Sequence, residues 1–389
     1  MNKARLQIAF LTSTDAHDKR SWSGIHYYMA KALERNCGDV HYIGPVKPEL
    51  ALIRGKAQSY LSKKLTGKRF EYRHSVALAK AYGKIFTDKL KQGKYDIIFA
   101  PASSSNIAFL ETNTPIVYLS DTTFANMIGY YPAYTNLQKK SEDEGNAIER
   151  MALAKSTLAL FPSEWAANSA INYYGIDKAK VYINPLGANI DSIPDRETVL
   201  SQKKKTVCKL LFLGVNWERK GGPIAFDTLN QLNALGIDTE LTVCGCVPPA
   251  NFVHPKMKVI SFLNKNNATD SEVFKKLLLE SDFLILPSRS ECFGVVFCEA
   301  SAFGLLSIAA NTGGISGAVK EGINGVLLPY QSGGKEYAEV IKNIFSSDER
   351  YYSLRKNSRD LFESSLNWDK WAMDVNGLIQ ALLKQLIQK

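Results

Sequence analysis

The chain has 389 residues, of which 45% are hydrophobic and 22% are charged. This composition is that of a globular protein long enough to form two domains with separate cores. No apolar stretch approaches the roughly 20 residues that a membrane-spanning helix needs, and the N-terminal residues lack the features of a signal peptide. The six cysteines form neither a CxxC pair nor a zinc-like spacing, so we expect reduced thiols, no metal site and a cytoplasmic location.

The net charge of +10 is concentrated in one segment, residues 54–94. This segment contains twelve lysines or arginines but only two acids, Glu71 and Asp88. Such a run is either the solvated face of ordinary helices or a surface that attracts anionic lipid, phosphate or an acidic acceptor. No nucleic-acid-binding motif accompanies the segment, so we do not expect a nucleic acid as partner.

Short apolar runs alternate with amphipathic stretches through the first half of the chain, which is typical of a parallel sheet covered by helices. Helices are clearest at 25–35 and 144–155. The sequence predicts strands at 7–13, 40–43, 95–100, 116–119, 158–161 and 180–183. These elements together predict one doubly wound domain.

A polar segment, 191–205, contains Pro194 and three consecutive lysines and is the best candidate for a linker. The alternation of strands and helices then restarts, so a second Rossmann-like domain is expected. Its predicted strands are 207–213, 239–244, 258–262, 283–286, 307–310 and one near Val326, and its predicted helices are 223–235, 270–279 and 295–303. We therefore expect domains at 1–195 and 206–366, followed by an amphipathic C-terminal helix over 367–389.

The loop after the strand at 283–286 is the richest in chemistry, with the sequence LPSRSECFGVVFCE. Glu291 lies in this loop, whereas Glu299 lies inside the following helix among apolar neighbours. A buried carboxylate is costly unless it accepts hydrogen bonds. Ligand hydroxyls could donate these bonds.

A second candidate loop, GVNWERKGGP, follows the strand at 207–213. Gly214 allows the backbone to turn away from the sheet. Arg219 and Lys220 then precede a glycine pair at the start of a helix, whose free N–H groups could bind an anion. Ordinary surface charge is the alternative interpretation of both cations.

Both loops resemble glycosyltransferase family 4. The family's E-x7-E signature matches Glu291 and Glu299, and the following sequence EASAFGLLSIAANTGGISGAVKEGINGVLL resembles the family's next turns, with Leu306 where proline is usual. The resemblance implies that Glu291 contacts the donor sugar, that Glu299 binds the ribose, and that the amides of Phe293 and Gly294 position donor groups. Lys220 matches the family's lysine that neutralises the departing diphosphate.

Three positions depart from the family pattern. Val215 replaces the usual arginine after Gly214, so either Arg219 takes over that role or the phosphate site differs. Gly24 matches the family's glycine loop after the first strand, but only one glycine is present where two are common, and a plain turn is at least as good an explanation. Asp121 stands where many members have a histidine near the donor sugar, and a helix or turn cap is its alternative role.

The resemblance implies a GT-B fold: two Rossmann-like α/β domains that face each other across a cleft, with the C-terminal helix crossing back to the first domain. It further implies a retaining, metal-independent transfer from a nucleotide-sugar donor without another cofactor. The acceptor would be a glycan or lipid-linked molecule in cell-surface synthesis, with the enzyme peripheral on the inner face of the membrane through 54–94.

Three alternatives were weighed. A nucleotide-sugar epimerase of GT-B type is the closest enzymatic alternative. A non-enzymatic, two-lobed sugar-binding protein would need export. A dinucleotide-dependent oxidoreductase is disfavoured, because the first strand leads into TSTDAHDKRSWSG rather than a G-x-G-x-x-G turn.

Overall fold

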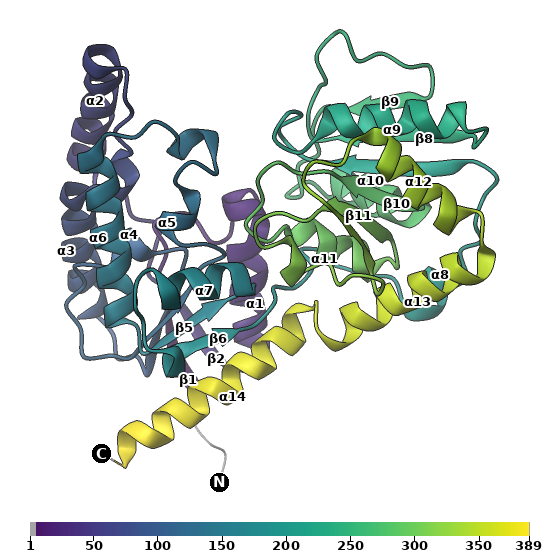
Figure 1. The fold of residues 1–389 in the computed structure, drawn as a ribbon. Helices are drawn as coiled ribbons and strands as arrows, with labels where there is room; N and C mark the ends of the chain where they lie inside the picture. Colours follow the sequence, from purple (N-terminus) through teal and green to yellow (C-terminus); the bar gives the residue numbers. More distant parts are fainter. Residues whose placement is uncertain (1–4, 389) are drawn as a thin grey trace. The chain divides into compact units, whose positions relative to one another are not determined.

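The computed structural model describes residues 5–388 as two compact units (Figure 1). Unit 1 extends to Asn184 and resumes at Ala372, and unit 2 comprises Pro185–Trp371. Each unit is built on one six-stranded parallel sheet with helices between its strands. The predicted α/β class, with two Rossmann-like sheets, is confirmed.

The sheet of unit 1 has the strand order β2-β1-β3-β4-β5-β6. Its strands are β1 (Leu6–Phe10), β2 (Gly38–Tyr42), β3 (Ile97–Pro101), β4 (Ile116–Leu119), β5 (Leu158–Phe161) and β6 (Val181–Ile183). Its helices are α1 (Ile25–Asn36), α2 (Glu49–Thr66), α3 (Val76–Leu90), α4 (Ser104–Ile107), α5 (Phe124–Met127), α6 (Lys139–Lys155) and α7 (Glu164–Asn172), with a short 3₁₀ turn η1 (Ser21–Gly24) ahead of α1. The chain adds β2 on one side of β1 and β3 on the other, so the direction in which strands are added to the sheet reverses at β1. Ligands of such sheets bind beyond the carboxyl ends of the strands at this point.

Alternate residues of the buried strands point to opposite faces of the sheet. On one face, Ile98 and Tyr118 belong to an apolar cluster with Phe86 of α3 and Ala167 of α7. On the other face, the rings of Phe10 and Phe99 stack. Apolar residues on both faces explain why these strands are continuous hydrophobic runs.

The sheet of unit 2 has the order β12-β11-β10-β7-β8-β9. Its strands are β7 (Cys208–Leu213), β8 (Thr239–Cys244), β9 (Met257–Ile260), β10 (Phe283–Leu286), β11 (Leu306–Ala310) and β12 (Gly325–Leu328). Its helices are α8 (Arg196–Leu200), α9 (Gly222–Ala234), α10 (Ala268–Glu280), α11 (Val295–Ala302), α12 (Gly334–Phe345) and α13 (Asp348–Ser364). Counted from β7, this is the 3-2-1-4-5-6 order of nucleotide-binding Rossmann domains, with its reversal between β7 and β10.

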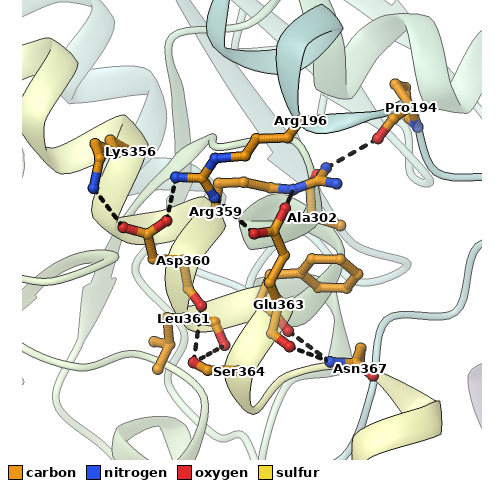
Figure 2. A network of polar contacts seen from close by, with 11 residues as sticks. Pro194, Arg196, Ala302, Lys356, Arg359, Asp360, Leu361, Glu363, Ser364 and Asn367 are labelled. Carbon is orange, nitrogen blue, oxygen red and sulfur yellow. Dashed lines mark hydrogen bonds and ion pairs between the residues drawn. The ribbon is translucent and has the colours of Figure 1, made fainter.

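The segment 191–205, expected to be a linker, is packed into unit 2 by arginines (Figure 2). Arg196 of α8 forms ion pairs with Asp360 and Glu363 of α13 at 2.5 and 2.6 Å. Arg359 of α13 donates hydrogen bonds to the carbonyls of Pro194 and Ala302. Polar side chains therefore fix a segment whose few apolar residues made it look like a linker.

The last helix, α14 (Trp368–Ile387), begins in unit 2 and continues in unit 1 from Ala372 onward. The Cys37 thiol donates to the Ala372 carbonyl at 3.3 Å, and the Asn376 side chain donates to the carbonyl of Asn36 at 3.1 Å. Both contacts attach α14 to the end of α1. Across residues 5–388, no helix combines the length and the hydropathy required to cross a membrane.

Candidate functional site

In unit 2, the loops after β7 and β10 leave neighbouring strands at the reversal of the sheet order. β7 and β10 are paired in parallel, so their carboxyl ends lie at the same edge of the sheet. The first loop contains Arg219 and Lys220, and the second contains Glu291. The fold thus brings together two sequence motifs that lie about seventy residues apart.

Lys220 and Glu291 form an ion pair between these loops. Both side chains are almost buried, with exposed fractions of 11% and 12%. Two partly desolvated charges of opposite sign stabilise each other. If one is removed, the charge that remains buried without its partner destabilises the fold. A cation and a carboxylate placed in this way at a sheet edge can respectively bind an anionic leaving group and orient hydroxyls.

Glycines allow the backbone of the two loops to approach closely. Gly221 has a φ of 78°, and a Cβ atom there would lie 2.0 Å from the carbonyl oxygen of Pro287. A Cβ atom on Gly214 would lie 2.7 Å from Cγ of Lys220, so the absence of a side chain leaves room for the lysine. Gly294 has a φ of 85° at the start of α11. Only glycine adopts such positive φ values at no steric cost.

Arg219 forms two hydrogen bonds between the two loops. Its guanidinium donates to the carbonyl of Ser290 at 2.9 Å, and its own carbonyl accepts from the amide of Arg289 at 2.7 Å. Val215, where the family has arginine, is 70% exposed and supplies no charge. Arg219 therefore has a structural contact that the sequence did not reveal.

The helices α9 and α11 both begin at this edge without a side-chain cap, at Gly221 and Gly294 respectively. Uncapped helix N-termini present backbone N–H groups that favour anions. Phe293, whose amide was expected to position donor groups, is buried. The carbonyl of Glu291 accepts from the amide of Gly314, which fixes the acidic loop to the turn after β11.

Glu299 is buried inside α11 and is ion-paired with a residue that sequence reasoning missed. Nζ of Lys265, in the loop before α10, lies 2.5 Å from Oε1 of Glu299. Burial raises the pKa of Glu299, while Lys265 and the backbone amide of Asn189 act in the opposite direction. Lys265 also stacks over the ring of Phe274 at 4.2 Å. The one sequence signal for Lys265 was its place in a loop after a strand of the same sheet.

In unit 1, Gly24 ends a loop with unusual backbone geometry. Trp22 and Ser23 have φ values of 47° and 56°, and Gly24 follows at 89°. Left-handed conformations of non-glycine residues cost about 1–3 kcal/mol and cluster at functional sites. His26, in the first turn of α1, lies directly after this loop. It contacts Thr14 and the ring of Trp22, and burial lowers its pKa to about 4.

Asp121 follows β4, the strand beside β3 in the sheet of unit 1. The helix cap that was considered for Asp121 belongs to another residue, because Oγ1 of Thr123 accepts from the amide of Asn126 at the start of α5. The side chain of Ser120 bonds to the carbonyl of Thr122 and shapes the same turn. Asp121 is half-buried and is not the cap of α5.

Comparison with known proteins places the chain in a family. The family described as Glycosyltransferase Family 4 matches residues 26–192, and Glycosyl transferases group 1 matches residues 200–361. Spore coat protein SA of Bacillus subtilis (strain 168) is 36% identical over 310 residues, which cover 74% of this chain and 78% of that protein. The chain spans 37%, 65% and 50% of the length of the first three curated relatives it matches.

Solved structures share the fold at low sequence identity. Sucrose-phosphate synthase from Thermosynechococcus elongatus has a TM-score of 0.67 and 16% identity over 98% of this chain and all of that chain. Anabaena Alr3699/HepE, solved in complex with UDP-glucose, has a TM-score of 0.61 and 15% identity, again over 98% of this chain and 100% of that chain. With the two family matches and the B. subtilis relative, these findings show that the chain belongs to glycosyltransferase family 4 and has the GT-B type of fold.

Proposed function

We propose that this chain is a retaining glycosyltransferase that uses a nucleotide-sugar donor. The observation that carries the proposal is the nearly buried ion pair between Lys220 and Glu291 at the strand-order reversal of unit 2. Uncapped starts of α9 and α11 flank this pair and favour an anionic ligand. A diphosphate bound there would place its sugar beside Glu291.

Each side chain receives a distinct role in this proposal. Lys220 neutralises the diphosphate as its bond to the anomeric carbon breaks, and the positive charge of Arg219 beside it assists. Glu291 orients the sugar through its hydroxyls. Glu299 accepts hydrogen bonds from the ribose, with Lys265 maintaining its charge. Gly214, Phe293 and Gly294 shape the donor site.

Retention follows if the acceptor hydroxyl attacks from the face that the diphosphate leaves. The bond between the anomeric carbon and the acceptor oxygen forms as the bond to phosphate breaks, and the acceptor proton passes to the departing phosphate oxygen. This step needs no protein nucleophile, only positioned reactants. The charge of the leaving group is balanced by side chains and helix N-termini, so we propose a reaction without a metal ion or another cofactor.

The acceptor side is assigned to unit 1. We propose that the strained loop ending at Gly24 approaches the donor and acceptor, and that Asp121 binds a sugar hydroxyl. The acceptor would be a glycan or lipid-linked molecule used in cell-surface synthesis. The basic segment 54–94 would then hold the enzyme on the cytoplasmic face of the membrane.

A thermal-shift screen against UDP, GDP and ADP tests the donor class, because a ligand that binds only the native state raises the melting temperature. UDP is the first choice, since the related fold of Alr3699/HepE was solved with UDP-glucose. The matching nucleotide sugar is then incubated with and without acceptor sugars. Mass spectrometry should show transfer only with an acceptor, and NMR should show the donor's anomeric configuration in the product. A changed sugar without any acceptor would instead identify an epimerase.

A further inference from the structure

The helix α2 of unit 1 carries its large apolar side chains on the outside. A helix on the surface of a globular protein normally turns its apolar stripe toward the core. Five large apolar residues of α2 are instead between 51% and 78% exposed: Leu50, Ile53, Tyr60, Leu61 and Leu65. At 3.6 residues per turn they fall within an arc of about 140° on one side of the helix, opposite Gly55 and Ser62. Figure 1 shows α2 at the margin of its unit.

The packed side of α2 consists of small residues and Leu52, which is partly buried against the core of unit 1. Gly55 and Ser62 are its buried residues. A Cβ atom on Gly55 would lie 2.9 Å from Cβ of Tyr72, so glycine is required for the close contact there. The hydroxyl of Ser62 donates to the carbonyl of Lys68 at 2.7 Å. The helix therefore attaches to the unit through its small side and leaves its apolar side without a partner in unit 1.

Cations lie among the exposed apolar residues. Within α2 and the turn after it, Glu49 is the one acid, at the first position of the helix. Five exposed cations belong to this segment: Arg54, Lys56, Lys63, Lys64 and Lys68. Long basic side chains can lie along an apolar surface while their charged ends remain in water. Exposed apolar side chains interspersed with such cations can insert among the lipids of an anionic membrane while the charged ends stay at the headgroups.

We infer that α2 is an in-plane membrane helix, whose apolar face inserts between the lipids of an anionic bilayer while its cations contact the headgroups. The inference makes the proposed membrane location specific: the anchor is α2, not the whole basic segment, and it includes insertion as well as charge attraction. Insertion predicts a bound fraction that survives high salt, because salt screens charges but does not weaken apolar contacts. It does not depend on the chemistry of unit 2.

The test is flotation of the full chain with vesicles of neutral lipid or neutral plus anionic lipid, at low and high salt. Leu61→Ser/Leu65→Ser should lower the partition coefficient about tenfold or more on anionic vesicles and abolish the salt-resistant fraction. Val247→Ser/Val253→Ser, at two exposed positions of unit 2, is the matched control and should behave as the native chain. Nucleotide-induced thermal shifts of all variants show whether the fold and the proposed donor site are intact.

A charge comparison completes the test. Lys63→Gln/Lys64→Gln/Lys68→Gln should weaken binding at low salt more than Lys84→Gln/Lys89→Gln/Lys94→Gln, which removes equal charge from the exposed residues at and after α3. Equal flotation of the leucine variant and the native chain would overturn the inference, since charge alone would then explain binding. Sedimentation that shows a dimer dispersed by the leucine variant, without vesicle binding, would also overturn it and assign α2 to a second copy of the chain.

Discussion

Glu291 and Glu299 are eight residues apart, yet their surroundings in unit 2 differ. Glu291 pairs with Lys220 in a loop, whereas Glu299 lies within α11 beneath Lys265. If Glu299 binds the ribose, Glu299→Ala should weaken binding of the nucleoside diphosphate by about 1.5–3 kcal/mol, the size of a charged hydrogen bond. If Glu291 contacts the donor sugar as proposed, Glu291→Ala should mainly lower kcat. Calorimetric titration measures the affinity of both variants for the nucleoside diphosphate, and steady-state kinetics measure kcat. An unchanged affinity in Glu299→Ala would remove the ribose assignment.

Lys220 should matter more as the diphosphate departs than in the resting complex. We expect Lys220→Ala to lower kcat by roughly tenfold or more, with a smaller effect on KM. Lys276→Ala removes a lysine whose side chain is 71% exposed on α10 and serves as the control. Steady-state kinetics on the folded variants decide the matter. Normal turnover by Lys220→Ala would assign the leaving group to another residue.

The sequence identified Lys220, Glu291 and Glu299 because they belong to short motifs with fixed spacing. It did not identify Lys265, which belongs to no motif and meets Glu299 only because β9, β8, β7 and β10 are neighbours in that order. The helix cap at Thr123, two residues after Asp121, was missed for a related reason. Asp121, Thr122 and Thr123 all have side chains that can cap a helix, and only the backbone conformation decides which one does.

At the scale of elements, two arginines in different environments attach the segment around α8 to α13 (Figure 2). The side chain of Arg359 is 7% exposed and bonds to two carbonyls, whereas that of Arg196 is 38% exposed and its two acids are similarly exposed. Arg359→Ala should therefore lower the free energy of unfolding by roughly 2–4 kcal/mol. Arg196→Ala should lower it by about 1 kcal/mol or less. Urea denaturation compares them, and equal losses would contradict this account.

In unit 1, burial raises the pKa of Glu149 on α6 to about 7, with hydrogen bonds from Tyr118 acting against the shift. The folded state then holds this proton more tightly than the unfolded chain, whose carboxyl has its ordinary pKa of 4.5. Stability should accordingly fall as the pH rises from about 4.5 to about 7. In Glu149→Gln this loss should disappear, so the free energy of unfolding of the variant should rise relative to that of the native chain between about pH 5 and pH 8.

Urea denaturation of the native chain and Glu149→Gln at about pH 5 and pH 8 measures this difference. Asp143→Asn, an acid on the same helix with a side chain 60% exposed, is the control and should follow the native pH dependence. Parallel pH dependences of Glu149→Gln and the native chain would show that Glu149 is not the titrating group.

The sequence predicted elements best where both faces are buried. β4, β5 and β10 have the predicted bounds, because each is a short, fully buried apolar run between turns. β8 also has the predicted bounds, although its residues alternate and Glu240 is exposed. The segments between strands were expected to be helices, but the bounds of α2 were not predicted, since its exposed side mixes apolar and basic residues and therefore lacks an amphipathic pattern. The segment 191–205 looked like a linker because arginine contacts, rather than apolar residues, attach it to α13.

At the scale of the molecule, the number of sheets followed from the alternation of strands and helices, but their strand orders did not. The order in unit 2 is what joins the loops after β7 and β10 into one candidate site. No local property of residues 208–213 or 283–286 specifies that these strands pair. The family resemblance implied that both loops serve one donor site, and the comparisons with known proteins show the family.

The central claim is that a nucleotide-sugar donor binds at this edge of unit 2. Hydrogen exchange of the full chain, with and without the nucleoside diphosphate that raises its melting temperature most, tests it directly. We predict slower amide exchange in the loops 214–222 and 287–299, around Lys220, Glu291 and the start of α11. Protection confined to unit 1, or no protection at saturating diphosphate, would contradict the account.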